Sequence, residues 1–177
     1  MTELVARQMT LCETDIVVDY FHGASHEFLK SLGVSPENLP DSGDWRAFYR
    51  AEYERPIERR RAILVLWELD GRPIGFSTAD KIIFGEQAYM HLHILRPDQR
   101  RSGYGTVLVK ETAKIYFRAL NIRRLYCEPY ARNEAPNKTL RKAGFRYIKT
   151  YETTPGPLNF RQPVNRWLLE ADAPDPE

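Results

Sequence analysis

Two glycines, Gly103 and Gly105, stand in a segment whose residues suit the binding of an anion. The segment lies between an apolar stretch and a long stretch with helical periodicity. Glycine lets the main chain approach a ligand closely, and the N–H groups at the start of a helix lack intrahelical partners. An anion is therefore the favoured guest of such a turn. Local positive charge, which suits a pyrophosphate, comes from three arginines: Arg96, Arg100 and Arg101.

The same turn does not fit the two common nucleotide motifs. It lacks the Lys-Ser/Thr pair of a Walker loop, which removes the main support for magnesium-dependent phosphoryl transfer. A dinucleotide fingerprint needs a third glycine three residues after Gly105, where the sequence has Leu108. From these residues alone, a plain strand-to-helix turn with a solvated basic edge is the alternative to a phosphate site.

Two histidines just before the turn are candidates for proton transfer. His91 and His93 alternate with apolar residues, so both project from one face of the predicted strand. An imidazole near its reference pKa of about 6.5 accepts a proton close to neutral pH. We therefore consider His93 first, and His91 second, as a base or proton relay. The alternative for both is a hydrogen-bonded position in the core.

The elements that must position these residues follow from the periodicity and from glycine and proline. An Asp70-Gly71 hairpin signal joins the first two of six predicted strands, and the residue period changes from two to about 3.6 after Pro97. The predicted strands cover residues 62–69, 73–84, 88–95, 124–127, 145–152 and 164–169. The predicted helices cover residues 25–33, 45–55, a long segment from the glycine turn to about 119, and 136–143. This order predicts one mixed α/β domain.

Composition narrows the functions that are possible. The chain has 177 residues, 42% of them apolar, and its 26 basic and 24 acidic residues give a net charge of +2. We therefore expect one domain over residues 1–170 with a disordered tail at 171–177, and no nucleic-acid or membrane partner. No signal segment or spanning run is visible, so we expect a soluble, cytoplasmic protein. Cys12 and Cys127 lie far apart, which predicts neither a metal site nor a disulfide.

Two ordered motifs together resemble the GNAT superfamily of N-acetyltransferases. The first is Arg100-x-x-Gly103-x-Gly105 after a strand that ends in Leu-Arg-Pro, and the second runs from Asn133 to a Lys-x-Gly-Phe ending at Phe145. The resemblance covers about residues 60–169 and is closest to the ribosomal-protein alanine acetyltransferase-like branch. It implies an α/β (α+β) fold with a mixed, mostly antiparallel sheet of six to seven strands. That sheet is splayed in the middle and flanked by about four helices.

The resemblance implies acetyl-CoA as the acyl donor and no metal. In this family the turn binds the pyrophosphate, and the pantetheine runs along the splay between two strands. The N–H of Leu95 is then expected to polarise the thioester carbonyl, and the side chain of Asn133 to bond the pantetheine. The residues expected to bind the donor are Leu95, Arg96, Pro97, Arg100, Arg101, Ser102, Gly103, Tyr104, Gly105, Thr106, Asn133, Pro136, Asn137 and Leu140.

The family's chemistry is direct attack of a neutral amine on the thioester, which needs a base and a proton donor for the thiolate. Besides the histidines, Glu128 is a second candidate base. Many relatives carry a tyrosine acid on the short helix, but Leu140 stands at that position, and Pro136 stands where the ribosomal branch usually has serine. Tyr130 is a possible replacement acid. Cys127 has no histidine partner in the sequence, which disfavours an acyl-cysteine route.

The acceptor is the least predictable part of the site. In this family the N-terminal helices, here residues 1–60, form one wall of the acceptor pocket, so Trp45 and Tyr49 are candidates, with Phe160 on the opposite loop. A core position is the alternative for the aromatic residues of the helix. Candidate acceptors are a protein N-terminus, an aminoglycoside or polyamine, and a hydroxamate precursor, used by a monomer or homodimer. A CoA-binding regulatory module without catalysis is the alternative function.

Overall fold

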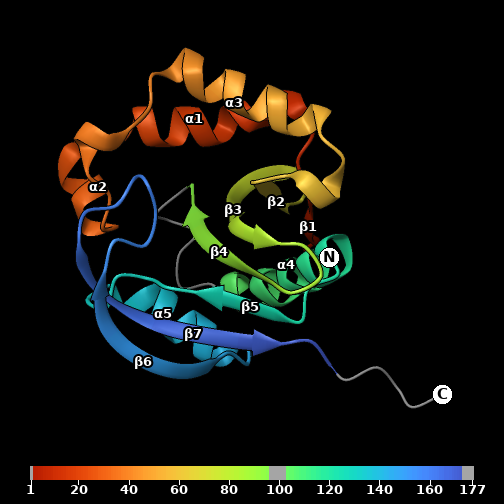
Figure 1. The fold of residues 1–177 in the computed structure, drawn as a ribbon, viewed down its shortest axis with the longest axis vertical. Coiled ribbons are helices and arrows are strands. Elements are labelled where there is room, and N and C mark those ends of the chain that lie inside the picture. Colours follow the sequence, from red (N-terminus) through yellow and green to blue (C-terminus); the bar gives the residue numbers. More distant parts are fainter. Residues whose placement is uncertain (1, 96–102, 173–177) are drawn as a thin grey trace.

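The structure is a computed structural model that describes residues 2–95 and 103–172. Its centre is a seven-stranded sheet in the order β1-β2-β3-β4-β5-β7-β6 (Figure 1). Neighbouring strands are antiparallel except for β4 and β5, which are parallel. The strands are β1 (Leu4–Gln8), β2 (Ile63–Leu69), β3 (Arg72–Ile83), β4 (Gln87–Ile94), β5 (Arg124–Cys127), β6 (Arg146–Thr153) and β7 (Gln162–Glu170). The predicted α/β fold with a mostly antiparallel sheet is confirmed.

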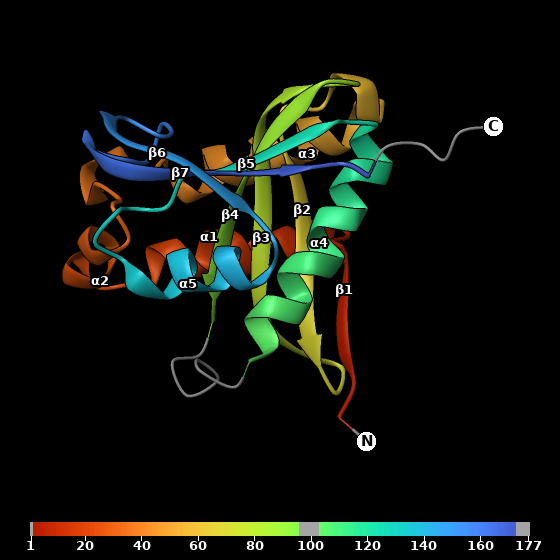
Figure 2. The ribbon, with the colours of Figure 1, turned by 90° about the horizontal axis from the view of Figure 1, so that it is seen from below.

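Helices cover both faces of this sheet (Figures 1 and 2). The α-helices are α1 (Asp15–His22), α2 (His26–Ser31), α3 (Ser42–Glu54), α4 (Tyr104–Leu120) and α5 (Glu134–Lys142). Helices α4 and α5 lie on one face, and α1 and α3 lie across the other. Within the described residues, no helix is both long and apolar enough to cross a membrane.

Two elements near the N-terminus were not predicted from the sequence. Strand β1 has only five residues and pairs with β2 at the edge of the sheet, where Arg7 bonds Glu68 of β2 and Glu13. Helix α1 follows directly. The five residues of β1 carry no clear strand pattern of their own, and they are extended because they pair with β2. Local periodicity therefore did not predict this strand. The segment before residue 60 was expected to be helical, but it begins with a β-strand.

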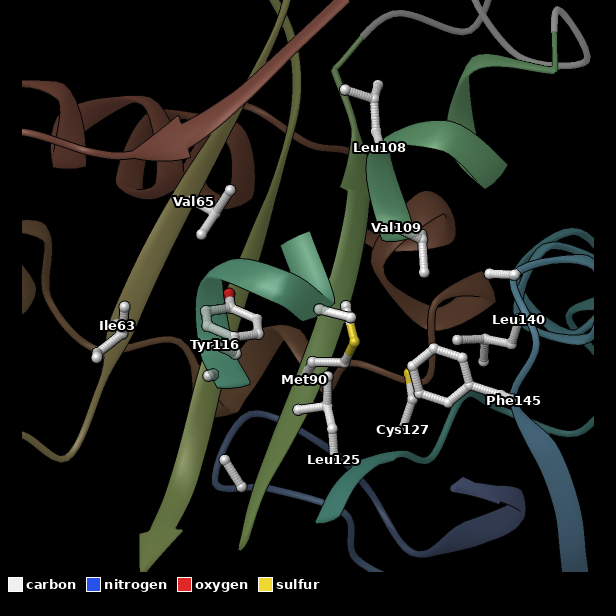
Figure 3. Close-up of a cluster of buried hydrophobic side chains, with 14 of the residues drawn as sticks. Ile63, Val65, Met90, Leu108, Val109, Tyr116, Leu125, Cys127, Leu140 and Phe145 are labelled. Carbon is white, nitrogen blue, oxygen red and sulfur yellow. The ribbon is translucent and has the colours of Figure 1, made fainter. Parts of the chain in front are cut away.

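The core under α4 is filled with side chains and its polar groups are paired (Figure 3). Tyr116 of α4 lies against the sheet near Met90, and its hydroxyl is 3.0 Å from the Ser77 hydroxyl, to which it donates a hydrogen bond. Trp67 donates its Nε1–H to the Thr112 hydroxyl over 2.7 Å. Such fully paired buried polar groups stabilise a unique packing.

The two parallel strands separate where the site is expected. Their pairing runs from Gln87 opposite Arg124 to Met90 opposite Cys127, and β5 ends there. Strand β4 continues to Ile94, while the chain after β5 is held towards β7, through a bridge between Tyr130 and Val164. The predicted splay is confirmed, and among the described residues it leaves the edge of β4 that faces β5 without a strand partner beyond Met90.

Candidate active site

A cavity of about 430 Å³ lies between the sheet and the helices α1 and α3. The wall formed by these two helices is apolar. The opposite wall, which we call the floor, is formed by β3 and β4 where the helices cover them. The loop between β6 and β7 forms a further wall, and the segment after β5 closes the side next to the splay. The residues that line the cavity include Val17, Phe21, Asp44, Trp45, Phe48, Tyr49, Arg61, Thr78, Asp80, His91, His93, Glu128, Tyr130, Asn133, Pro136, Leu158, Asn159 and Gln162.

His91 and Asp80 form a close pair on the cavity floor. His91 Nε2 lies 3.1 Å from Asp80 Oδ1, and both side chains are partly buried. Burial lowers the pKa of His91, but the charge of Asp80 opposes it and leaves the pKa raised above its ordinary value. Burial likewise raises the pKa of Asp80, and His91 outweighs it, so the pKa of Asp80 is lowered. The pair is therefore a carboxylate beside an imidazole that readily accepts a proton.

His93 has very different surroundings although it is two residues away on the same strand. Its ring stacks on Phe76 with 4.9 Å between centroids, and Phe21 lies edge-on at 5.1 Å. Burial, with a smaller contribution from His91, lowers the pKa of His93 to about 3. An imidazole that stays neutral among aromatic rings is a weak base. These environments favour His91 over His93 as a base, the opposite of the order expected from the sequence.

Glu128 is buried and already engaged by its neighbours. Arg166 Nε donates to its carboxylate over 2.6 Å, and the hydroxyl of Tyr151 donates to the same oxygen. Burial, followed by the bond to Glu128, raises the pKa of Tyr151 to about 12, so this hydroxyl stays a donor. A carboxylate held by an arginine and a tyrosine ties β5, β6 and β7 together.

The segment after β5 brings two predicted site residues to the cavity. Tyr130 lines it, and its ring lies edge-on to Phe160 with 6.1 Å between centroids. Asn133 also lines the cavity at the start of α5, and its side chain makes no capping bond to that helix. Pro136 lines the same region. These residues stand beside the splay, where a pantetheine chain is expected.

Two other predicted donor-binding residues of α5 have structural roles. Asn137 accepts hydrogen bonds from Asn165 and from Trp167 Nε1, at 2.9 and 2.8 Å, and so anchors α5 to β7. Leu140 is fully buried in the core between α5 and the sheet (Figure 3). The position at which many relatives carry a tyrosine therefore faces the core, and it presents no hydroxyl to the cavity.

The N–H of Leu95 does not face the splay. It donates to the carbonyl of Ile74 in β3 over 2.9 Å, so it is not available to polarise a thioester, and this expectation is wrong. N–H groups alternate in direction along a strand. The N–H groups that point to the unpaired edge are consequently those of Leu92 and Ile94. Which edge each amide faces depends on strand register, which the sequence did not reveal.

Part of the predicted phosphate turn is described. Gly103 adopts a left-handed conformation with φ of 82° immediately before α4, as its glycine suggested. Tyr104, Gly105 and Thr106 then form the first turn of the helix, and a Cβ at Gly105 would lie 3.6 Å from Thr139 of α5. The remaining residues expected to bind the donor here, Arg96, Pro97, Arg100, Arg101 and Ser102, lie outside the described residues.

Of the three residues predicted to contact the acceptor, two line the cavity and one does not. Trp45 and Tyr49 are buried in the core between α3 and the sheet and also line the cavity, and their contact with an acceptor stays a prediction. Phe160 contacts Tyr130 but is not part of the cavity wall. Asp80 was not among the site residues predicted from the sequence. Its only signal there is an acidic residue near the end of an apolar, β-branched stretch, in the strand β3 that pairs with β4, which carries His91 and His93.

Cysteine and metal chemistry find little support at this site. Cys127 is buried, and burial raises the pKa of its thiol well above the ordinary value, so the reactive thiolate is disfavoured. In residues 2–95 and 103–172, no group of three or more His, Cys, Asp or Glu side chains is arranged to hold a metal ion.

The family is established by sequence. A model of the acetyltransferase (GNAT) family matches residues 21–145, which is more than half of the chain, so the chain belongs to this family. The resemblance inferred from the two motifs is thereby confirmed. A search among curated proteins found no match to this sequence.

Solved structures share the fold over nearly the whole chain. One is a RimL ribosomal L7/L12 α-N-protein acetyltransferase in complex with coenzyme A, with a TM-score of 0.75, 16% identity, and coverage of 97% of this chain and 96% of that one. A spermidine N-acetyltransferase from Vibrio cholerae, in complex with CoA and spermine, has a TM-score of 0.74, 15% identity and coverage of 94% and 95%. The aminoglycoside acetyltransferase AAC(6')-Ib, with coenzyme A and kanamycin, has a TM-score of 0.69, 16% identity and coverage of 95% for both chains.

Proposed function

We propose that this protein is an N-acetyltransferase that transfers the acetyl group of acetyl-CoA to a primary amine by direct attack in a ternary complex. The observation that carries the proposal is the position of the His91 and Asp80 pair, on the floor of a cavity that adjoins the splay of β4 and β5. Family membership supports the reaction, and structures of the same fold that hold CoA together with an amine support the ternary complex.

The residues at the splay fit an acyl-CoA donor. The unpaired edge of β4 offers the N–H groups of Leu92 and Ile94, which we assign to the pantetheine and the thioester carbonyl. The side chain of Asn133, which makes no capping bond, faces the same region. Gly103 and the first turn of α4 offer backbone N–H groups to the phosphates. The proposed site thus offers a hydrogen-bonding group to the phosphates, to the pantetheine and to the thioester.

The reaction requires the attacking nitrogen to lose two protons and the departing thiolate to gain one. The imidazole of His91 takes a proton from the bound ammonium at Nδ1, because its Nε2 faces Asp80, and the Asp80 carboxylate stabilises the imidazolium that forms. The nitrogen lone pair then attacks the thioester carbonyl, and the carbon–sulfur bond breaks as the amide forms. We assign to Tyr130 the donation of a proton to the departing thiolate, and its hydroxyl regains a proton as the nitrogen loses its second one. No covalent enzyme intermediate is involved.

Release of CoA thiol from acetyl-CoA in the presence of amines tests the proposed function. A glycine variant of the phosphate turn links that activity to the donor site. Gly103→Asp places an anion and a strained side chain at the start of α4, and we expect at least a hundredfold loss of acetyl-CoA affinity by calorimetry.

Gly85→Asp is the matched control for this variant. Gly85 has φ of 78°, and like Gly103 it has no atom within 4 Å of an added Cβ. Its N–H bonds the carbonyl of Leu120, so it lies at the opposite end of α4. The control should bind acetyl-CoA normally. Equal affinity in both variants would refute the donor site, and donor binding without thiol release for any amine would favour a non-catalytic CoA-binding module.

A further inference from the structure

The cavity also restricts the kind of amine that fits. Resting on the proposed function, we infer that the acceptor is a small primary amine with an apolar, aromatic or aliphatic, body. A polycation such as an aminoglycoside or polyamine does not match its charges, and an extended peptide end does not match its shape. Four properties of the cavity carry this inference: its walls, its charges, its closure and its effect on the amine.

The walls that face the His91 and Asp80 pair are apolar. Val17 and Phe21 of α1 and Trp45 and Tyr49 of α3 are at most 7% exposed and line the cavity. Phe48 adds a half-buried ring to the same wall. Burial of an apolar ligand surface against such side chains contributes about 25 cal/mol for each Å² removed from water. A charged ligand body would lose its hydration here without replacement.

Arginines neutralise two carboxylates at or beside the cavity, whereas Asp80 faces the imidazole of His91. Glu128 is held by Arg166. Arg61 binds Glu52 over 2.7 Å, and Glu52 is fully buried. Among the described residues that line the cavity, the remaining carboxylate is Asp44, which is exposed at its rim. Among the described lining residues, the carboxylates without an arginine partner are thus Asp44 at the rim and Asp80 on the floor, whereas a polycation presents more ammonium groups than these two can match.

The loop between β6 and β7 lies beside α2 (Figure 1), and its residues line the cavity there. Asn159 pairs with Val34 as an isolated bridge and donates its Nδ2–H to the carbonyl of Gly33 over 2.9 Å. The N–H of Ser35 donates to the carbonyl of Leu158 over 2.8 Å. Gln162 is buried and donates to the same Gly33 carbonyl over 2.6 Å. A peptide cannot run through a wall tied by these bonds, and 430 Å³ is a small-molecule volume.

An apolar cavity also helps the chemistry. Removing an ammonium group from water disfavours its charged form, so its pKa falls and the neutral nucleophile becomes more accessible. The proton then has one acceptor on the cavity floor, His91 beside Asp80. A small apolar amine therefore gains both binding energy and reactivity in this cavity.

The test compares four acceptors of different charge and size at one pH with the full chain. They are 2-phenylethylamine, n-hexylamine, spermidine and an alanine-initiated hexapeptide, and kcat/KM is measured by thiol release from acetyl-CoA. We expect the two apolar amines to exceed spermidine and the peptide by at least a hundredfold. Spermidine or the peptide as the best acceptor would overturn the inference and leave the acetyltransferase function intact.

Binding of the same amines is measured by calorimetry in the presence of CoA, which separates the two claims. If no amine releases thiol but 2-phenylethylamine binds more tightly than spermidine, the proposed function fails and the ligand class stands. If neither apolar amine binds or reacts, the inference is overturned. This readout does not depend on turnover.

A matched pair of variants locates the binding to the cavity. Phe48→Ala truncates a half-buried wall residue, and we expect about a tenfold rise in KM for 2-phenylethylamine. Phe84→Ala removes an exposed ring, 39% accessible, from the turn between β3 and β4, and it should leave KM unchanged. An equal KM in Phe48→Ala and the wild type, with both proteins folded by thermal unfolding, would place the acceptor elsewhere.

Discussion

The two faces of the sheet carry apolar side chains from the same strands, but they differ in how their buried polar groups are paired. On the face covered by α4, Trp67 and Tyr116 donate to the hydroxyls of Thr112 and Ser77. On the face covered by α1 and α3, Asp80 Oδ1, His91 Nε2 and His93 Nδ1 are buried without a hydrogen bond of good geometry among the described residues. One face is filled, whereas the other keeps a cavity of about 430 Å³.

This difference separates groups that stabilise the fold from groups that are kept for chemistry. A buried polar atom without a partner costs about 1–3 kcal/mol, so its retention calls for an explanation. Among the described residues of the α4 face, no buried side-chain nitrogen or oxygen lacks a partner. On the other face, the imidazole of His91 beside Asp80 offers a proton acceptor to a bound amine. Side chains alternate between the two faces along a strand. Ser77 and Met90 therefore belong to the filled face, whereas their neighbours Thr78 and His91 line the cavity.

The largest effect should come from removing the imidazole of the cavity pair. His91→Ala should lower kcat/KM by about 10²–10⁴-fold, because the general base is lost. His93→Phe is the control, since an aromatic ring replaces a neutral imidazole that stacks on Phe76. It should retain activity within a few fold. Loss of turnover in His93→Phe with His91→Ala still active, both measured by thiol release, would restore His93 as the base.

A smaller effect is expected when the carboxylate of the pair is neutralised. Asp80→Asn should lower kcat/KM about tenfold at high pH, because the imidazolium loses its stabilising charge. Asp80 raises the pKa of His91 against the lowering effect of burial, so its removal should shift the rise of kcat/KM to lower pH. Profiles recorded with one amine keep the acceptor's own titration constant. A midpoint that stays fixed or moves to higher pH would contradict the pairing.

On the filled face the same kind of change should affect stability alone. Thr112→Val removes the acceptor of the Trp67 Nε1–H, which should cost about 1–3 kcal/mol of the free energy of unfolding in urea. The value of kcat/KM should stay unchanged. Val107→Ala, at a position 48% exposed on the same helix, is the control and should cost much less. A lower kcat/KM in Thr112→Val with normal stability would contradict the claim that the face covered by α4 serves stability and not catalysis.

The sequence allowed the frame of the site to be predicted, but not its pairings. Helix α4 and the glycine before it were predictable because their signals are local: a period of 3.6 and a residue tolerant of positive φ. Strand β1 was missed because a neighbour determines it. The role of Asp80, the engagement of Glu128 and the direction of the Leu95 N–H depend on register and on contacts between distant segments. Such contacts leave no local pattern.

Titration of the ring nitrogens of His91 and His93 by NMR, with signals assigned from the two single variants, tests directly which histidine serves as the base. We expect His91 to gain its proton with a pKa above the ordinary value of about 6.5, and His93 to stay neutral from pH 8 down to pH 5. A protein in which His93 titrates in this range while His91 stays neutral would contradict this expectation.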